Sequence, residues 1–278
     1  MTILVTGASG HVGSGVLNAL TAAGANVRAV SRSPRPGQFP DGVDVVRADL
    51  DDPQTYSAAL DGVQKVFLYA SPLTAGDFAA AARRAGVEHI VVLSSIGVVS
   101  PHPENNPIAR THQAVEDAII ESGVDWTFVR PGYFATNMLR WEDIRTLREL
   151  RTAFPDATSS PVHERDIAGV AALSLLEDAQ RGRAHAVLGA GPSTVREQVA
   201  AISRAIGEPV RLVSIDVDAY RQQLSASLPV FAVDHLIQAA GNIPVPPPDA
   251  AIDSVRELLG RAPLSFEEWA KDHADQFR

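Results

Sequence analysis

The sequence predicts an α/β protein of the Rossmann type, with a doubly wound parallel sheet and a small, mostly helical C-terminal lobe for the substrate. Three observations predict this fold class. Strand-like and helix-like segments alternate through the first half of the chain, the strand-like segments are apolar, and a glycine-rich turn joins the first strand to the first helix. Apolar strands that alternate with helices form a parallel sheet covered on both faces.

The elements of the first half follow from periodicity. The first strand is a short β-branched run, and the helix after it carries Val12, Val16 and Leu20 at helical spacing, with Gly24 at its expected end. The predicted strands are 2–6, 26–32, 43–50, 65–71, 89–95 and 126–132, and the predicted helices are 11–24, 52–62, 74–86 and 107–123. Residues 1–135 are therefore predicted to form a dinucleotide-binding Rossmann core.

After about residue 135 the rhythm changes. A helix is expected to pack back on the sheet, and a later helix begins with a capping box in which Ser193 or Thr194 precedes Glu197. The predicted elements are helix 163–178, strand 183–191, helix 193–207, strand 209–216, a Pro-rich break at 241–250 and two short closing helices. Residues 136–278 are thus expected to contribute late sheet elements and the smaller substrate lobe.

Composition excludes several kinds of site. The chain has 278 residues, of which 45% are hydrophobic and 21% charged, which suffices for a sizeable core. It has no cysteine, which excludes disulfides, thiolate metal sites and a cysteine nucleophile. His102, His112 and His163 lack metal-ligand spacing, so no metal is expected.

Charge bears on partners and location. The formal net charge of −9 gives no electrostatic footprint for nucleic acid and no basic face for an anionic membrane. No leader-like or membrane-length apolar segment is visible. We therefore expect a soluble cytoplasmic protein, a monomer or a homodimer, that acts on a small molecule.

The glycines after the first strand indicate a dinucleotide. Gly7, Gly10 and Gly13 stand at a three-residue spacing, a variant of the dinucleotide fingerprint, in the strand-turn-helix context that this fingerprint requires. Such a turn brings the pyrophosphate to the free N–H groups of the helix N-terminus. The alternative is a tight turn with close packing and no ligand.

The end of the second strand bears on the choice of cofactor. A carboxylate there would bind the ribose hydroxyls of NAD, but Ser31, Arg32 and Arg35 occupy the region instead. A guanidinium forks onto a 2′-phosphate, so NADPH is predicted over NADH. The alternative for these arginines is a solvated basic turn. Asp49 follows the third strand, where it either accepts from the adenine amino group or caps the next helix.

Several stretches together resemble the NmrA-like group of atypical short-chain dehydrogenases/reductases. They are "TGASGHVGSGV", "VRADLDDPQTYSAALDGVQKVFLYASP", "HIVVLSSIGV", "SGVDWTFVRPGYFATN" and "LLGRAPLSFEEWAKDH". The resemblance covers nearly the whole chain and is strongest over residues 1–140. It implies a substrate cleft between a Rossmann domain and the C-terminal lobe. The group includes NADPH-dependent quinone reductases, triphenylmethane and azo-dye reductases, isoflavone-reductase-like enzymes and regulators that bind the cofactor without turnover.

The resemblance also implies roles for individual residues. The pyrophosphate loop would comprise Gly7, Ser9, Gly10, His11, Val12 and Gly13. The remaining cofactor contacts would be Arg32 at the 2′-phosphate, Asp49 and Leu50 at the adenine, Ala70 and Ser71 at the ribose, Ser94 and Ser95 beside the nicotinamide, and Pro131, Gly132 and Tyr133 at the carboxamide.

The chain departs from the usual short-chain dehydrogenase pattern at the proton donor. That pattern has Tyr-x-x-x-Lys on the helix after the fifth strand, and here Ile108 and His112 stand in those two places. Isoleucine donates no proton, so the usual alcohol dehydrogenase mechanism is not expected. His112 binds the nicotinamide ribose or acts as an acid in one interpretation and faces solvent in the other.

The substrate contacts are expected just beyond the sixth strand. Tyr133, Phe134, Asn137 and His163 are expected to face the cleft, where aromatic rings stack on a planar substrate; the alternative is that they pack the lobe. Asp166 is expected to cap the helix that follows.

These observations favour an NADPH-dependent reductase that passes hydride to a planar, electron-poor acceptor, either quinone-like or a conjugated carbonyl. Such an acceptor needs little protein acid, which suits a site without the tyrosine. A non-catalytic sensor of NADP(H) is the alternative. A further alternative is a carbonyl or double-bond reductase of secondary metabolism, with His112, Ser95 or Tyr133 as the proton donor.

Overall fold

The computed structural model describes residues 1–69, 71–226, 228, 230, 233–234, 236–237 and 254–278. Ala70 and the Pro-rich break at 241–250 lie outside these residues. The chain divides into two compact units, which we describe separately. The first unit comprises Met1–Gly132, Glu164–Val187 and the described part of Pro247–Ala262. The second unit comprises Tyr133–His163, the described part of Leu188–Pro246, and Pro263–Arg278.

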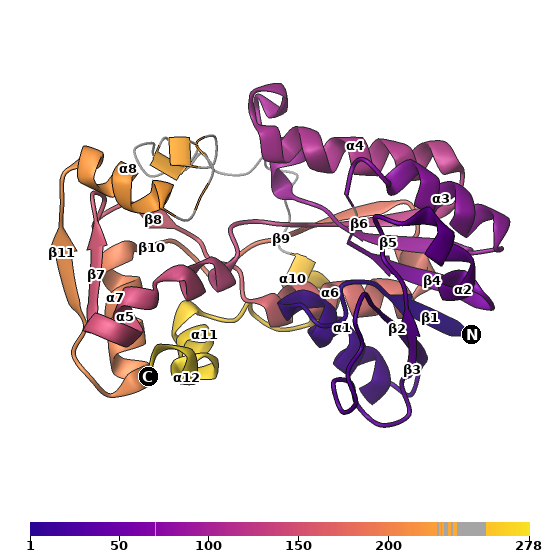
Figure 1. The fold of residues 1–278 in the computed structure, drawn as a ribbon, viewed down its shortest axis with the longest axis horizontal. Coiled ribbons are helices and arrows are strands. Elements are labelled where there is room, and N and C mark those ends of the chain that lie inside the picture. The colour runs from indigo at the N-terminus through magenta and orange to yellow at the C-terminus, as the bar shows by residue number, and fades with distance from the viewer. Residues whose placement is uncertain (70, 227, 229, 231–232, 235, 238–253) are drawn as a thin grey trace. The chain divides into compact units, whose positions relative to one another are not determined.

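The first unit contains a seven-stranded parallel sheet in the order β3-β2-β1-β4-β5-β6-β9 (Figure 1). Its strands are β1 (Thr2–Val5), β2 (Asn26–Ser31), β3 (Asp44–Arg47), β4 (Val63–Leu68), β5 (His89–Leu93), β6 (Asp125–Pro131) and β9 (Arg183–Val187). The predicted Rossmann fold is confirmed. The strand order reverses between β1 and β4, and ligands of such sheets bind beyond the carboxyl ends of the strands at this point.

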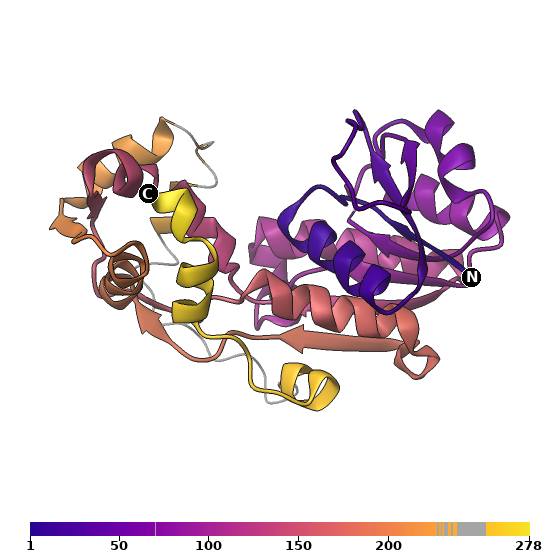
Figure 2. The ribbon, with the colours of Figure 1, turned by 90° about the horizontal axis from the view of Figure 1, so that it is seen from below.

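Helices cover both faces of this sheet. Figures 1 and 2 show α1 and α6 over one face, while α3 and α4 lie over the other with α2. Their bounds are α1 (His11–Ala22), α2 (Tyr56–Leu60), α3 (Ala75–Arg84), α4 (Pro107–Ser122), α6 (Glu164–Leu176) and α10 (Ser254–Leu259), the last of which packs on α6. A Cβ on Gly15 of α1 would lie 2.8 Å from the Cβ of Ala168 on α6, so small residues let these two helices approach closely.

The second unit is built from shorter elements. They are η4 (Ala135–Arg140), α5 (Glu142–Leu147), β7 (Glu149–Thr152), β8 (Thr158–Ser159), β10 (Ser193–Thr194), α7 (Val195–Ile206), β11 (Arg211–Ser214), α8 (Val217–Ser225), α11 (Phe266–Asp272) and α12 (Ala274–Phe277). The predicted strand 209–216 is present as β11, but it pairs with β7 in a small sheet rather than with the central one. The predicted capping box is present, and Thr194 is its N-cap residue.

The core of the second unit gathers around α7 and the last two helices. Trp269 and Phe277 are buried there with Ile202 and Ile206 of α7. Trp269 stacks on Phe266, with ring centroids 5.0 Å apart. A second capping box, formed by Ser265 and Glu268, begins α11. Among the described helices, none is long and apolar enough to cross a membrane.

Candidate functional site

The turn after β1 folds tightly against the first turn of α1. Gly7 has φ +59°, a conformation that favours glycine, and its carbonyl accepts the Gly10 N–H at 2.9 Å. A Cβ on Gly13 would lie 2.1 Å from the Gly7 oxygen and 2.6 Å from the Gly7 carbonyl carbon. Only glycine therefore fits at position 13, because any side chain there would push the turn off the helix.

The N-terminus of α1 lacks a side-chain cap. Its N-cap residue is Gly10, no acidic residue stands in the first turn, and Ser14 makes the first intrahelical bond by donating to the Gly10 carbonyl. Ser9, Gly10 and His11 are exposed, whereas Val12 and Gly13 are buried. An uncapped N-terminus over a glycine turn presents N–H groups and the positive end of the helix dipole, which fits a diphosphate.

Thr6 joins the ends of β1 and β4, the neighbouring strands between which the strand order reverses. Its buried hydroxyl donates to the Phe67 carbonyl at 3.0 Å and accepts the Tyr69 N–H at 2.8 Å. The ends of β1 and β4 are therefore held together where the strand order reverses. We did not predict this residue, although a threonine that ends an apolar strand just before a glycine turn was the available signal.

Two arginines meet at the carboxyl ends of β2 and β3. Parallel pairing sets Ser31 opposite Arg47, and Arg47 Nε donates to the carbonyl of the next residue, Arg32, at 3.2 Å. Both arginines are exposed. Arg35 is also exposed and belongs to a turn in which its N–H donates to Gln38 Oε1 at 3.0 Å. Arg47 was not among the predicted site residues.

Asp49 shapes the loop after β3. Its Oδ1 accepts the Asp51 N–H at 3.1 Å, and its own N–H donates to Thr55 Oγ1 at 3.1 Å. The cap of the following 3₁₀ turn, η1 (Pro53–Thr55), is instead Asp52, so the capping alternative for Asp49 is wrong. The Leu50 carbonyl accepts the Tyr56 hydroxyl, which holds this loop against α2.

Ser71 lies in the turn after β4. Its hydroxyl oxygen accepts the Leu73 N–H at 3.3 Å, and its carbonyl accepts the N–H groups of Thr74 and Ala75. Ala70, the other residue expected at the ribose, lies outside the described residues. The side chain of Ser71 is partly exposed at the carboxyl end of the sheet.

Ser94 belongs to a buried charged network. Its Oγ donates to Glu116 Oε1 at 2.5 Å. Arg130 donates to both oxygens of the same carboxylate, from Nε to Oε1 at 2.9 Å and from Nη2 to Oε2 at 2.5 Å. Ser94 and Glu116 are almost fully buried. The hydroxyl of Ser94 thus points its proton into the protein, and its expected place beside the nicotinamide stays a prediction.

Ser95 caps the 3₁₀ helix η2 (Ile96–Val99) after β5, whereas Ile108 and His112 lie in the first two turns of α4. Ser95 Oγ accepts the Gly97 N–H at 3.2 Å, which leaves the hydroxyl proton free to be donated elsewhere. Ile108 is 47% exposed in the first turn of α4. His112 is partly buried, and this burial lowers its pKa below the usual value, an effect opposed by the negative charge of Glu116 one turn further along.

The residues after β6 open the second unit. Phe134 forms a parallel bridge with Val162, whose N–H donates to the Tyr133 carbonyl at 2.7 Å. Tyr133 is partly exposed, and the pKa of its hydroxyl is raised, chiefly by burial, although a side-chain hydrogen bond with Asn137 acts in the opposite sense. The phenol therefore keeps its proton at neutral pH.

His163 is packed in the second unit, which was the alternative to a place at the cleft, and Asp166 does not occupy the cap position expected of it. His163 is 1% exposed, and its Nε2 lies 3.3 Å from Asp272 Oδ2, so it is a packed residue rather than part of an open wall. Asp166 is the third residue of α6 and not its cap. Its Oδ1 lies 2.7 Å from Nη2 of Arg261, whose side chain is exposed although the carboxylate itself is buried.

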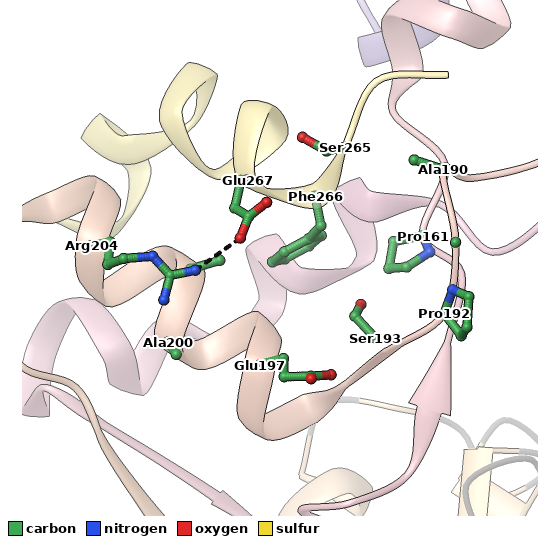
Figure 3. Close-up of a pocket in the computed structure, with 12 residues that line it drawn as sticks. Pro161, Ala190, Pro192, Ser193, Glu197, Ala200, Arg204, Ser265, Phe266 and Glu267 are labelled. Atoms are coloured by element: carbon green, nitrogen blue, oxygen red, sulfur yellow. Dashed lines mark hydrogen bonds and ion pairs between the residues drawn. The ribbon is translucent and has the colours of Figure 1, made fainter. Parts of the chain in front are cut away.

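The second unit also contains a pocket of about 370 Å³. Figure 3 shows Arg204 of α7 paired with Glu267 of α11 along one wall, at 3.0 Å, with Phe266 beside them and Pro161 and Pro192 opposite. Glu197, which also lines the pocket, has its carboxylate engaged in the capping box of α7. None of the predicted site residues lines this pocket.

The chain is similar to a known protein family and to curated proteins. The profile of the NAD(P)H-binding family matches residues 7–178. The (4-alkanoyl-5-oxo-2,5-dihydrofuran-3-yl)methyl phosphate reductase of Streptomyces griseus is 39% identical over 280 residues, which cover 99% of each chain. The NAD(P)H azoreductase of Xenophilus azovorans is 33% identical over 288 residues, again 99% of each chain.

Solved structures share the fold. The triphenylmethane reductase of Citrobacter sp. in complex with NADP(H) matches with a TM-score of 0.76 and 21% identity over 99% of this chain and 100% of that one. The quinone oxidoreductase QOR2 of Escherichia coli in complex with NADPH matches with a TM-score of 0.79 and 22% identity over 98% of this chain and 99% of that one.

Proposed function

Because the chain belongs to the NAD(P)H-binding family of NmrA-like oxidoreductases, we propose that it is an NADPH-dependent reductase of a double bond conjugated with carbonyl groups. Membership itself makes it an NAD(P)H-dependent oxidoreductase with a small-molecule substrate. The preference for NADPH, the acceptor and the roles of individual residues are the proposal.

One observation carries the cofactor proposal. The first turn of α1 lies so close to the glycine turn that position 13 has no room for a side chain, since a Cβ on Gly13 would lie 2.1 Å from the Gly7 oxygen. This packing leaves the uncapped helix N-terminus open to a ligand at the carboxyl edge of the sheet. The N–H groups between Ser9 and Val12, other than that of Gly10, which already donates to the Gly7 carbonyl, would hold the pyrophosphate, and Ser71 would face the ribose. When bound, the reduced nicotinamide supplies the hydride.

The adenosine end supports NADPH. Arg32 follows β2 directly, its side chain is exposed, and no carboxylate occupies residues 31–35. A guanidinium there would bind a 2′-phosphate through paired N–H groups. Asp49 keeps one oxygen, Oδ2, outside the turn that it forms with Asp51, and that oxygen would accept from the adenine amino group.

The absence of the usual acid supports the choice of acceptor. Ile108 stands where the tyrosine of the usual short-chain dehydrogenases would donate a proton to a carbonyl. The name of the Streptomyces griseus relative describes an unsaturated lactone with an acyl group, in which hydride addition leaves the negative charge on a carbon between two carbonyls. Such an enolate is stable enough to take its proton from water, and we propose an acceptor of this chemistry.

Several side chains would then act at the site without any one of them being an indispensable acid. Ser95 retains a hydroxyl proton to donate. His112, whose pKa burial lowers, is neutral near pH 7 and would hydrogen-bond the nicotinamide ribose. Tyr133 and Phe134 would bound the acceptor with their rings, Asn137 would orient the Tyr133 hydroxyl, and Pro131 would border the carboxamide.

The test is NADPH consumption by the purified chain with a panel of acceptors: an acylated unsaturated lactone, a quinone, a triphenylmethane dye and an isolated ketone. We expect turnover with the first three and the fastest rate with the lactone. The isolated ketone should be inert, since its alkoxide product needs an acid that Ile108 does not provide. Tight NADPH binding without turnover of any acceptor would refute the acceptor proposal, and reduction of the ketone alone would refute the argument from Ile108.

A further inference from the structure

We propose that Arg47 is a second specificity-determining residue of the site, which together with Arg32 binds the 2′-phosphate of NADPH. This inference rests on the proposed function. It concerns a residue on a strand other than the one that ends in Arg32, and it follows from how β2 and β3 pair.

The pairing of β2 with β3 places Arg47 beside the residue that precedes Arg32. Ser31 lies opposite Arg47, and Arg47 Nε donates to the Arg32 carbonyl at 3.2 Å. The bond uses Nε only, so both terminal nitrogens of Arg47 remain available as a fork. The same bond holds the backbone at the root of the Arg32 side chain. Arg47 would thus both contact the phosphate and orient its partner.

In the part of the chain that the structure describes, neither guanidinium pairs with a carboxylate. Within the described residues, no ion pair forms at Arg32 or Arg47, whereas Arg28, at the other end of the same pair of strands, binds Asp44 at 2.6 Å. The nearby carboxylates of Asp49 and Asp52 accept backbone N–H groups of their own loop. The carboxyl end of the β2–β3 pair is therefore a place of unneutralised positive charge on a chain whose net charge is −9.

Two like charges at the same end of neighbouring strands repel each other, and a dianion placed between them removes that repulsion. Neighbouring strands lie about 4.8 Å apart, which is a separation that one phosphate group can bridge. The ribose of the adenosine half lies beyond the carboxyl end of the second strand in this fold. A monoester phosphate on that ribose, present in NADPH and absent from NADH, is the ligand chemistry that fits.

The experiment compares cofactor binding by calorimetry in three variants. In Arg47→Gln we expect affinity for NADP+ to fall about tenfold or more, with affinity for NAD+ within about twofold of the parent. Arg32→Gln should behave alike, and the double variant should lose less than the product of the two effects, because both side chains serve one phosphate. Arg84→Gln removes an exposed charge at the last turn of α3 and should change neither affinity.

A small probe isolates the phosphate itself. Adenosine 2′,5′-bisphosphate should lose affinity for Arg47→Gln, whereas 5′-AMP should not. Three outcomes separate the claims. If the parent chain binds no nicotinamide cofactor, the proposed function fails. If it binds NADP+ and Arg47→Gln leaves that affinity unchanged, the inference fails while the function stands. If the variant weakens NADP+ and NAD+ equally, Arg47 acts only on the local backbone, and the inference is again overturned.

Discussion

The hydroxyl of Ser94 donates a 2.5 Å hydrogen bond to Glu116 and so joins the end of β5 to the middle of α4. Arg130, near the end of β6, completes the network by a two-point contact with the same carboxylate. Three neighbouring elements, β5, α4 and β6, are therefore connected at the carboxyl end of the sheet through the buried Glu116 carboxylate. These hydrogen bonds fix the position of α4 and, with it, the positions of Ile108 and His112.

Removal of that charge should destabilise the protein. Glu116→Gln keeps the shape of the side chain but leaves the Arg130 guanidinium without its counter-ion in a buried site. We expect the free energy of unfolding to fall by about 3–5 kcal/mol in urea titrations. The double variant Glu116→Gln/Arg130→Met should recover part of that loss, since no buried charge is then unpaired. A single variant as stable as the parent would show that the network does not hold the fold.

The close approach of Gly13 to Gly7 should make that position intolerant of any side chain. In Gly13→Ala the new Cβ would meet the Gly7 oxygen at 2.1 Å, so the turn must move and NADP(H) affinity should fall at least tenfold. Gly76→Ala is the matched control, because its Cβ would meet open space on α3. We expect this control to bind NADPH normally and to gain up to about 1 kcal/mol in stability. Equal cofactor affinity in both variants, measured by fluorescence titration, would contradict the account.

A buried histidine at the amino end of β5 should make the stability of the protein depend on pH. His89 is fully buried, its Nε2 contacts Thr127 Oγ1 at 2.9 Å, and Thr127 donates its own proton to the Gln180 carbonyl at 2.6 Å. The imidazole is therefore the Nε2–H tautomer. Burial, with the charges of Lys65 and Arg181, lowers the pKa of His89 from 6.5 to about 4.

The sign of the effect follows from that direction. Between pH 6.5 and about 4 the unfolded chain takes up a proton at His89 that the folded chain does not, so stability falls as pH falls through this window. The contribution is about 3 kcal/mol over the window. His89→Gln should lack this part of the acid sensitivity, while the exposed His102→Gln should retain it. Parallel pH profiles for the parent and His89→Gln would exclude the effect.

Proton delivery in the proposed reaction should not depend on one side chain. We expect Ser95→Ala, His112→Ala and Tyr133→Phe each to retain at least about a tenth of the parent kcat with a conjugated acceptor. The pKa of His112 lies below its usual value, so as an obligatory acid it would make kcat fall as pH rises through that pKa and go on falling from pH 6.5 to 8. A profile of kcat that is flat from pH 6.5 to 8 is the expected result. Loss of turnover in one variant alone would identify that residue as the donor.

The sequence by itself determined the frame of this protein. Apolar periodicity located every strand and α-helix over residues 1–132, though not the 3₁₀ helices at 96–99 and 103–105, and the spacing of Gly7, Gly10 and Gly13 located the turn that meets the first helix. These features depend on local backbone geometry, which neighbouring residues encode directly. The short elements between residues 136 and 162 escaped prediction, because strands of two to four residues carry too few positions to show a period.

Tertiary structure alone decided which side chains meet. Arg47 lies beside Arg32 because two parallel strands pair in one register, and Ser94 lies against Glu116 because α4 docks at one rotation on the sheet. Asp166 pairs with Arg261, far along the chain, instead of capping its own helix. Contacts of this kind depend on register and docking across crossovers, and neither leaves a repeating pattern in the residues that make them.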